Sequence, residues 1–391
     1  MKLLIGGDVC ITEDSLNIYN HGGLNNLFQK ELIKMFKETD FSIINIECPM
    51  TEFSNPILKC GPNNKISNSA ISILSDLQVT HASLANNHIL DYGMEGMEET
   101  LDSLISRDIK PIGISYDNQF SCILSKSDIN VGIISFADDE FNGFVTENGP
   151  INLYDPLTSF DMIKKLKEKC DYVVVLFHIG LEHYEYPTPN IQRICRKMVE
   201  CGADFVTCQH SHCIGAFEKI GNCYILYGQG NFHFFRKNNN EKKWNNAILV
   251  ELNFSKNKLE KPFWHFVNLN KGCLCLNEDV YDVVENFEKR SQEIRDKKFV
   301  NERFEGFCMS KMQPVELQLL RGSSNLNYYF NKLTNCRFVS ATLPQKKSIG
   351  MSNVIRCSVH NEVIKCILKK INYNYNSKTN KNFINKGLKN G

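Results

Sequence analysis

The chain has 391 residues, 42% of them hydrophobic and 23% charged, which is typical of a globular protein with one large domain or two. Its 45 Lys and Arg residues against 44 Asp and Glu leave a net charge of +1. This balance excludes a global field that would attract nucleic acid or an anionic membrane. Because no segment approaches the roughly 18 uninterrupted apolar residues that span a bilayer, we also expect no transmembrane segment.

The first residues, MKLLIGGDVC, are read as a strand, because they lack the apolar core and the cleavage site of a signal peptide. The sixteen cysteines are scattered, with no CxxC pair and one CxC at Cys273 and Cys275. That pattern is neither a disulfide framework nor a thiolate zinc site. We therefore expect reduced, mostly buried thiols and a cytoplasmic protein.

Up to about residue 210, apolar runs of strand length alternate with segments of helical period. This alternation predicts a largely parallel α/β sheet. The predicted strands are KLLIG (2–6), FSIINI (41–46), THASLA (80–85), VGIISFA (131–137), YVVVLF (172–177) and DFVTC (204–208). The predicted helices cover residues 24–39, 94–107, 159–169 and 190–202.

After residue 215 the pattern changes to four shorter alternating runs. They predict antiparallel strands that complete or flank a second sheet, at 216–221, 223–228, 246–254 and 261–269. Residues 280–335 again have a helical pattern and predict an appended subdomain. The last residues are rich in Lys and Asn and poor in branched apolar side chains, so we expect disorder there.

Polar side chains follow five of the predicted strands at the point where each strand ends. In a parallel sheet these ends lie at one edge, where ligands bind in α/β proteins. The residues concerned are Asp8, then Asn45 and Glu47, then Asn86, Asn87 and His88, then His178, and finally His210 and His212.

Two carboxylates, one amide oxygen and three imidazoles from this set form an oxygen and nitrogen shell that suits Mn, Fe or Zn. Six ligands exceed one tetrahedral zinc and suit two divalent metal ions with one bridging carboxylate. Taken singly, Asp8 also reads as a turn residue, Glu47 as a loop charge and the Asn-Asn-His run as a helix cap. The HSH run is more specific, because alternate residues of a strand share a face and His210 and His212 can then reach one centre.

These motifs resemble the CapA family of capsule (poly-γ-glutamate) synthesis proteins. The resemblance covers about residues 1–235 and rests on GGDV, NIECPMTE, SLANNHILDYGMEGMEETLDSL, FHIGLEHYEYPTPNIQRI, GADFVTCQHSH and YILYGQGNF, in the family's order. It implies a calcineurin-type metallophosphoesterase fold, a four-layer α/β sandwich of two mixed sheets flanked by helices.

The resemblance also implies roles for the polar residues. One metal would be held by Asp8, Glu47 and His212, and the second by Glu47, Asn87, His178 and His210. The metals would activate a bridging water for attack on phosphorus. His88 would protonate or stabilise the leaving oxygen. Asp91 would orient His88, or would instead cap the helix that begins near Met94.

The chain departs from the family pattern at several places. Cys10 stands where related phosphoesterases have His, and its thiol is either a soft metal ligand or a packed core group. Gln209 replaces a second His of the family pattern. Four residues are candidates for substrate binding, with a structural role as the alternative for each, namely Glu182, His183, Gln229 and Asn231. Arg236 and Lys237 would face an anionic substrate or form a solvated loop.

We therefore predict a CapA-like domain over residues 1–270, a mostly helical extension over 271–368 and a disordered tail over 369–391. The predicted function is a metal-dependent hydrolase of the phosphoesterase type in capsule or surface-polymer synthesis, acting on a small-molecule or polymeric substrate. The same chemistry would also cleave an amide of a γ-glutamyl polymer. The alternative is a non-catalytic, metal-containing assembly or polymer-binding component. The oligomeric state stays open.

Overall fold

A computed structural model describes residues 1–59, 61–140, 149–237, 241–276, 281–311, 353–354 and 356–369. Its strands are β1 (Lys2–Val9), β2 (Phe41–Ile46), β3 (His81–Ser83), β4 (Lys110–Ile112), β5 (Ser121–Lys126), β6 (Ile129–Ala137), β7 (Tyr172–His178), β8 (Phe205–Gln209), β9 (Phe217–Ile220), β10 (Cys223–Leu226), β11 (Asn231–His233), β12 (Asn246–Asn253), β13 (Phe263–Asn270) and β14 (Cys273–Leu276).

The helices are α1 (Glu13–Gly22), α2 (Leu24–Leu27), α3 (Lys30–Glu38), α4 (Ile71–Asp76), α5 (Gly93–Ile105), α6 (Ser159–Lys167), α7 (Pro189–Glu200), α8 (Lys242–Asn245), α9 (Tyr281–Glu293) and α10 (Lys297–Ser310), with a 3-10 turn η1 (Asn68–Ala70). Residues 358–369 form a further helix, which we call the C-terminal helix.

The described strands form two mixed sheets. The first has the order β14-β13-β12-β1-β2-β3-β4, with β11 paired to β1, and the second has the order β5-β6-β7-β8-β10-β9. In the first sheet β1 to β4 run parallel. Strands β12, β13 and β14 follow on the other side of β1, and each is antiparallel to its neighbour. In the second sheet β6, β7, β8 and β10 run parallel between two antiparallel edge strands.

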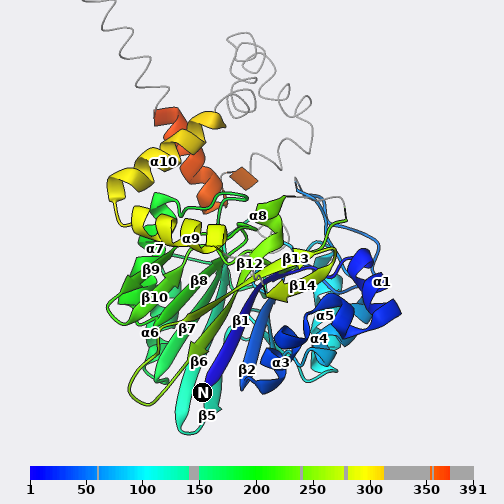
Figure 1. Ribbon diagram of the computed structural model, residues 1–391. Helices are drawn as coiled ribbons and strands as arrows, with labels where there is room; N and C mark the ends of the chain where they lie inside the picture. Colours follow the sequence, from blue (N-terminus) through cyan, green and yellow to red (C-terminus); the bar gives the residue numbers. More distant parts are fainter. Residues whose placement is uncertain are drawn as a thin grey trace, which may run out of the picture.

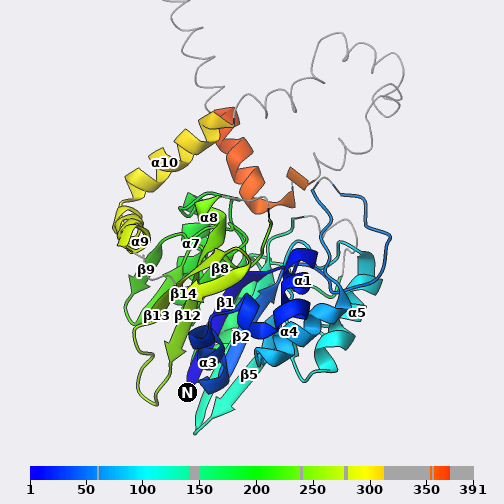
Figure 2. The same cartoon turned by 45° about the vertical axis from the view of Figure 1, so that its right-hand side comes forward.

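The two sheets pack face to face and helices cover their outer faces (Figures 1 and 2). Leu3, Ile5, Val174, Leu176 and Val250 belong to the core between the sheets. Helices α1 to α5 pack on the first sheet through one apolar cluster, and α6 and α7 pack on the second sheet through another. Alternate residues of each buried strand therefore face different cores, which confirms the predicted four-layer sandwich.

The structure corrects several details of the predicted elements. One predicted helix over 24–39 is two helices, α2 and α3, and β4, β5, α1 and α4 were not predicted. The strands that carry the polar ends lie in two sheets rather than one, because β7 and β8 belong to the second. Strands β12 and β13 join the first sheet through β1, whereas β9 and β10 complete the second.

Helices α9, α10 and the C-terminal helix lie over the end of the sheets at which the parallel strands finish (Figures 1 and 2). Strand β14 lies beyond the predicted domain boundary at residue 270 and still pairs with β13. The predicted tail, apart from Lys369, falls outside the described residues, as do residues 312–335 of the predicted helical subdomain.

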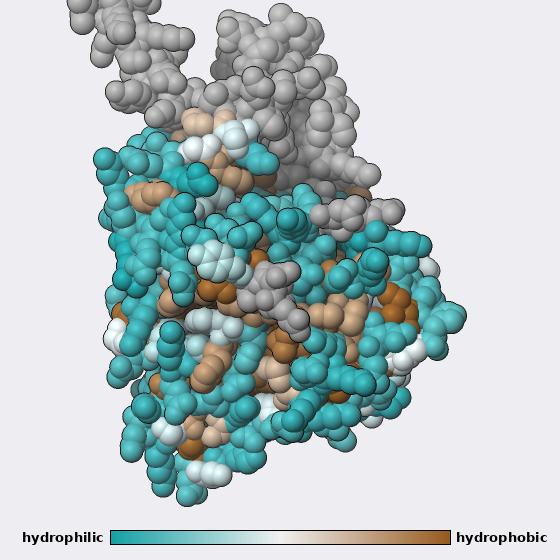
Figure 3. Space-filling view, viewed as in Figure 1, coloured by the Kyte–Doolittle hydropathy of each residue, from teal (hydrophilic) through white to brown (hydrophobic). Residues whose placement is uncertain are grey.

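The surface seen in Figure 3 is mainly hydrophilic, with apolar side chains exposed singly or in small groups. Among the helices that the structure describes, none has the length and apolar character needed to cross a membrane. The cysteines in the described parts of the chain are free thiols, most of them buried.

Candidate active site

The first strand delivers a carboxylate to the sheet edge through a close backbone approach. A Cβ at Gly7 would lie 2.0 Å from the Gly230 carbonyl oxygen, so glycine is required where β1 meets β11. The register of β1 against β2 then shifts between Ile5 and Asp8. This irregularity turns the fully buried Asp8 toward the end of the second sheet.

Both oxygens of Asp8 accept hydrogen bonds from the protein. Oδ1 accepts from Asn45 Nδ2 at 2.7 Å, and Oδ2 accepts from the His210 backbone N–H at 3.0 Å. The imidazole of His212 also approaches, with its Nδ1 3.5 Å from Asp8 Oδ2. Asp8 is thus held in place by both sheets.

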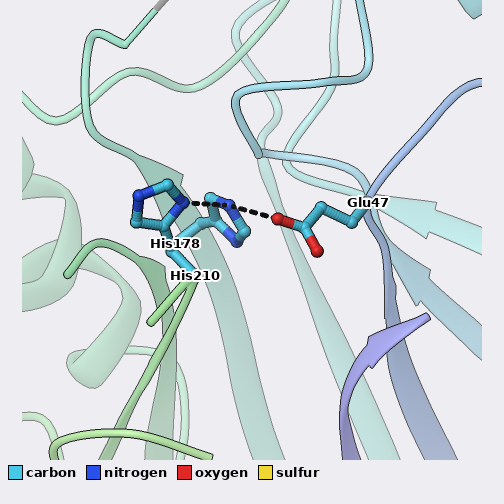
Figure 4. Close-up of side chains that lie close together, drawn as sticks. All are labelled: Glu47, His178 and His210. Carbon is cyan, nitrogen blue, oxygen red and sulfur yellow. Dashed lines mark hydrogen bonds and ion pairs between the residues drawn. The ribbon is translucent and has the colours of Figure 1, made fainter. Parts of the chain in front are cut away.

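Glu47, just beyond β2, points toward the imidazoles of His178 and His210 (Figure 4). Its Oε1 lies 3.4 Å from His178 Nε2 and 3.5 Å from His212 Nε2. The side chain is buried, and neither carboxylate oxygen has a hydrogen-bond partner. A buried carboxylate without hydrogen bonds is costly unless a cation completes its surroundings.

The remaining predicted ligands gather on the other side of Glu47. His178 ends β7, and its Nε2 lies 3.0 Å from Asn87 Oδ1 and 3.2 Å from His210 Nδ1. Asn87 follows β3 in the first sheet, so this contact joins the two sheets. Asn87, His178 and His210 line a small cavity together with Asp138, Glu140, Ile179 and Gly180.

Around Glu47, two sets of side chains have ligand atoms within 4.8 Å of one another. The first set is Asp8, Glu47 and His212, and the second is Glu47, His178 and His210. Since metal-to-ligand distances are about 2.0 to 2.3 Å, each set has the dimensions of one ion's shell. Glu47 belongs to both sets. The structure therefore brings together all six residues predicted as ligands, with Asn87 touching the second set.

We had expected the two histidines of the HSH run to share a face of one strand, and the structure shows that they do not. β8 ends at Gln209, and His210 and His212 have φ of +84° and +54° in the turn that follows. Left-handed backbone at non-glycine residues is uncommon and carries strain, which occurs most often at functional sites. The turn sends His212 to one set and His210 to the other.

Burial sets the protonation of the free side chains. It raises the pKa of Asp8 to about 7, with the charge of Glu47 adding to the effect, and it raises the pKa of Glu47 well above the usual range. Burial also lowers the pKa of His178 to about 4 and that of His212 well below its usual range. The imidazoles are thus neutral lone-pair donors near pH 7, and without a cation the two buried acids favour their protonated forms.

These features fit divalent metal ions. Divalent metal ions accept neutral imidazoles and carboxylates as ligands, and a bound cation would be the partner that the buried Glu47 oxygens lack. The partners around the set also orient it. Asn231 Oδ1 lies 2.8 Å from His212 Nδ1, so the Nε2 atom of His212 is the one that faces Glu47.

His88 lies beside Asn87 in a second buried cluster. Its Nδ1 is 2.7 Å from Asp91 Oδ2, and the other oxygen of Asp91 pairs with Lys59 Nζ. Helix α5 has Tyr92 as its N-cap residue and no side-chain capping bond. The geometry of Asp91 therefore fits orientation of His88, whereas the helix-cap alternative has no hydrogen bond to support it.

The four predicted substrate-binding residues fall into two pairs. Glu182 and His183 are exposed in the loop after β7, and the charge of Glu182 contributes to the raised pKa of Glu47. Gln229 and Asn231 are fully buried. Gln229 Nε2 donates to the Ile5 and Ile248 carbonyls between the sheets, so it does not join the site.

Arg236 and Cys10, which the sequence analysis also singled out, contact aromatic rings and a second thiol, respectively. The Arg236 guanidinium lies 4.7 Å from the centre of the Phe234 ring and 4.6 Å from that of Trp244. The Cys10 thiol lies 3.2 Å from the thiol of Cys48. This contact fits the packed-thiol alternative for Cys10, and Cys10 belongs to neither ligand set.

Sequence reasoning missed Lys59 and Glu140. Lys59 comes from a loop without regular structure, where nothing in the sequence marks it. Glu140 follows β6, whose sequence VGIISFA runs into Asp-Asp-Glu. A sixth strand thus ends in polar residues at the same edge, and this signal was available.

The chain is similar to known bacterial capsule synthesis proteins. The model of the family described as "Bacterial capsule synthesis protein PGA_cap" matches residues 2–236. The PGA biosynthesis protein CapA of Bacillus subtilis (strain 168) is 26% identical over 263 residues, which are 64% of this chain and 67% of that protein. The capsule biosynthesis protein CapA of Bacillus anthracis is 26% identical over 246 residues, 60% of each. The chain thus spans about two thirds of these relatives or less.

Among solved structures, a hypothetical protein from Thermus thermophilus has a TM-score of 0.44 at 16% identity, covering 68% of this chain and 98% of that one. A putative 5'-nucleotidase from Staphylococcus aureus has a TM-score of 0.41 at 12% identity, covering 74% and 58%. At these values the likenesses carry no argument about function. The family match spans more than half of the chain, and this protein therefore belongs to the PGA_cap family of bacterial capsule synthesis proteins.

Proposed function

We propose that this protein is a hydrolase of the metallophosphoesterase type that uses two divalent metal ions, Mn, Fe or Zn, in capsule or surface-polymer synthesis. The observation that carries the proposal is Glu47, which belongs to both ligand sets and whose buried oxygens lack hydrogen-bond partners. The family match and the relatives' names support the biological setting. The free thiols support the cytoplasm as the compartment.

Metal ions bound in the two sets would act as Lewis acids toward water and toward a substrate oxygen. The chain's own groups hold the ligands in position for this. Asn45 fixes Asp8, and Asn231 fixes the ring of His212. Because their own partners are already in place, the ligands need little rearrangement when the ions bind.

His88 is the proposed proton donor to the leaving group. Its Nδ1 lies 2.7 Å from Asp91 Oδ2 and 3.1 Å from Lys59 Nζ, which leaves Nε2 as the nitrogen that would carry the transferred proton. Burial lowers the pKa of His88, and the hydrogen bond to Asp91 opposes that shift and favours the imidazolium. Because the net shift of the pKa of His88 is downward, a proton that this imidazole carries is held weakly and is readily given to a leaving oxygen.

Arg236 supports an anionic substrate. Phe234 and Trp244, which hold its guanidinium, also pack on His212, with ring centres 5.9 Å and 4.7 Å from that imidazole. The charge of Arg236 reaches the site, since it lowers the pKa of Glu47 against the effect of burial. A phosphoester or a carboxylate-rich polymer would meet this cation beside the first ligand set.

The test uses His88→Asn and His210→Ala in the full chain, purified without chelator. Both are assayed on p-nitrophenyl phosphate, bis(p-nitrophenyl) phosphate and γ-glutamyl p-nitroanilide. We expect His88→Asn to keep its metal and lose roughly a hundredfold or more in turnover, the scale of a positioned acid or base. His210→Ala should lose metal and turnover together.

Two outcomes would contradict the proposal. If the metal-loaded wild-type protein turns over none of the three substrates, the alternative of a non-catalytic assembly or polymer-binding component is favoured. If His88→Asn keeps both metal and full turnover, His88 is not the proton donor. Cleavage of the γ-glutamyl amide alone would move the reaction from phosphorus to carbon.

A further inference from the structure

Glu140 lies behind the second ligand set and contacts two of its members. It is 6% exposed. Its Oε2 accepts a hydrogen bond from Asn87 Nδ2 at 3.3 Å and lies 3.2 Å from His210 Nε2. One carboxylate oxygen therefore serves two side chains that come from different sheets.

These contacts determine which atoms of the two side chains face the centre of the set. With its amide nitrogen on Glu140, Asn87 presents Oδ1 toward His178, at 3.0 Å. With its Nε2 on Glu140, His210 presents Nδ1 toward the same imidazole, at 3.2 Å. A carboxylate that accepts a hydrogen bond from the far nitrogen of a ligating histidine fixes the tautomer of that histidine and increases its basicity.

The other oxygen of Glu140 faces the C-terminal helix. His360 Nδ1 lies 3.6 Å from Glu140 Oε1. The two preceding acids hold the same segment of chain. Asp138 accepts from the Ser358 backbone N–H at 3.1 Å and from its hydroxyl at 2.9 Å, and Asp139 accepts from Arg356 Nε at 3.0 Å.

A second attachment fixes the far side of this helix to α7. Glu362 accepts from the Thr188 hydroxyl at 2.5 Å and from the Asn190 backbone N–H at 3.0 Å, at the start of α7. Val359, Val363 and Ile367 are buried against the apolar cluster that also contains residues of α7. The C-terminal helix is thus packed as part of the domain, although it lies outside the residues 2–236 that the family model matches.

We propose that Glu140 is a positioning residue for the second metal and that it couples this metal to the docking of residues 356–369. The inference rests on the proposed function only in taking Asn87 and His210 as ligands. Because coupling is reciprocal, metal binding should tighten the docking of the C-terminal helix, and docking should strengthen metal binding.

The first experiment measures the affinity of the full chain for Mn²⁺ and for Zn²⁺ by calorimetry. Glu140→Ala should bind the second metal roughly 10- to 100-fold more weakly, the range for lost outer partners of metal ligands, with Glu140→Gln between it and the wild type. His360→Ala should have a smaller effect in the same direction. The matched control is Glu218→Gln, whose carboxylate pairs with Arg196 away from the site and should leave the affinity unchanged.

The second experiment measures hydrogen exchange of the backbone amides of residues 358–369. In the wild-type protein, saturating Mn²⁺ should slow their exchange, and in Glu140→Ala the difference should disappear. A merely structural role for Glu140 would speed exchange equally with and without metal, which would overturn the coupling.

The outcomes separate this inference from the proposed function. If the Glu140 variants bind metal like the wild type while His210→Ala does not, the positioning role is wrong and the two-metal site stands. If the wild type binds neither Mn²⁺ nor Zn²⁺, the proposed function itself fails. An additional metal that is lost in Cys357→Ala would make Glu140 a ligand with Cys357 and His360, whose ligand atoms also lie within 4.8 Å of one another, and would overturn the positioning role.

Discussion

Two buried polar clusters lie next to each other in this protein, and they differ in how their charge is compensated. In the cluster around Asp91, one carboxylate oxygen pairs with Lys59, and the other accepts from His88 Nδ1 at 2.7 Å and from the Asn64 backbone N–H at 2.6 Å. In the cluster around Glu47, both carboxylate oxygens are buried without a hydrogen bond.

The difference indicates which cluster the chain completes by itself. A buried carboxylate is tolerated when it is paired and hydrogen-bonded, as Asp91 is. Glu47 and Asp8 face imidazoles that burial keeps neutral, and burial raises the pKa of both acids, so only bound cations would stabilise the two groups as carboxylates. The first cluster is therefore expected to stabilise the fold, and the second to bind ligands at some cost in stability.

The largest expected effect is the loss of the cation that serves Asp91. Lys59→Met should lower the free energy of unfolding by about 3 to 5 kcal/mol, because it leaves a buried charge without its partner. Urea denaturation measures the change, with the exposed Lys34→Met as the control. The double variant Lys59→Met/Asp91→Asn should recover part of the loss. A change no larger than that of Lys34→Met would contradict the comparison.

The corresponding change in the other cluster should have the opposite sign. Metal-free Glu47→Gln should be at least as stable as the metal-free wild type, because the substitution removes an unpartnered buried carboxylate. In the wild type, metal at a hundred times its Kd should add about 2.7 kcal/mol to the free energy of unfolding for each ion bound, and the variant should lose this gain. A metal-free variant that is clearly less stable than the wild type would show that the protein itself already stabilises Glu47.

A third prediction concerns a histidine outside both clusters. Burial lowers the pKa of His81 to about 4, so the unfolded chain binds a proton below about pH 6.5 that the folded protein does not bind until about pH 4. Stability should therefore fall as the pH drops through this window, by at most about 1.4 kcal/mol per pH unit for this group. His81→Gln should flatten the slope with or without Mn²⁺. An unchanged slope would mean that His81 does not titrate in this way.

Much of the site could be predicted from sequence because its ligands stand at the ends of apolar strands, where a core would exclude Asp8, Glu47 and His178. Their chemical types then indicate the metals. The partners of these residues were harder to predict. Lys59 reaches Asp91 across 32 residues from an irregular loop, and sequence spacing carries no information on such a contact.

The fold was predictable in its layers and less so in its strand pairing. The alternation of strands and helices specifies an α/β protein, yet the assignment of β12 to the first sheet depends on its pairing with β1, where Leu3 lies opposite Leu252. Both strands have a continuous apolar stretch, residues 3–5 in β1 and 247–250 in β12, and such a stretch fits either sheet. The positive φ of His210 and His212 likewise depends on packing and not on local sequence.

The most direct test of the two-metal site is the number of Mn²⁺ ions bound per chain, measured by elemental analysis after equilibrium dialysis. Because Glu47 belongs to both ligand sets and His212 to one, the wild type should bind two ions, His212→Ala one and Glu47→Ala none. A Glu47→Ala protein that is folded and still binds one or two ions would contradict the shared role of Glu47 and with it the two-metal site.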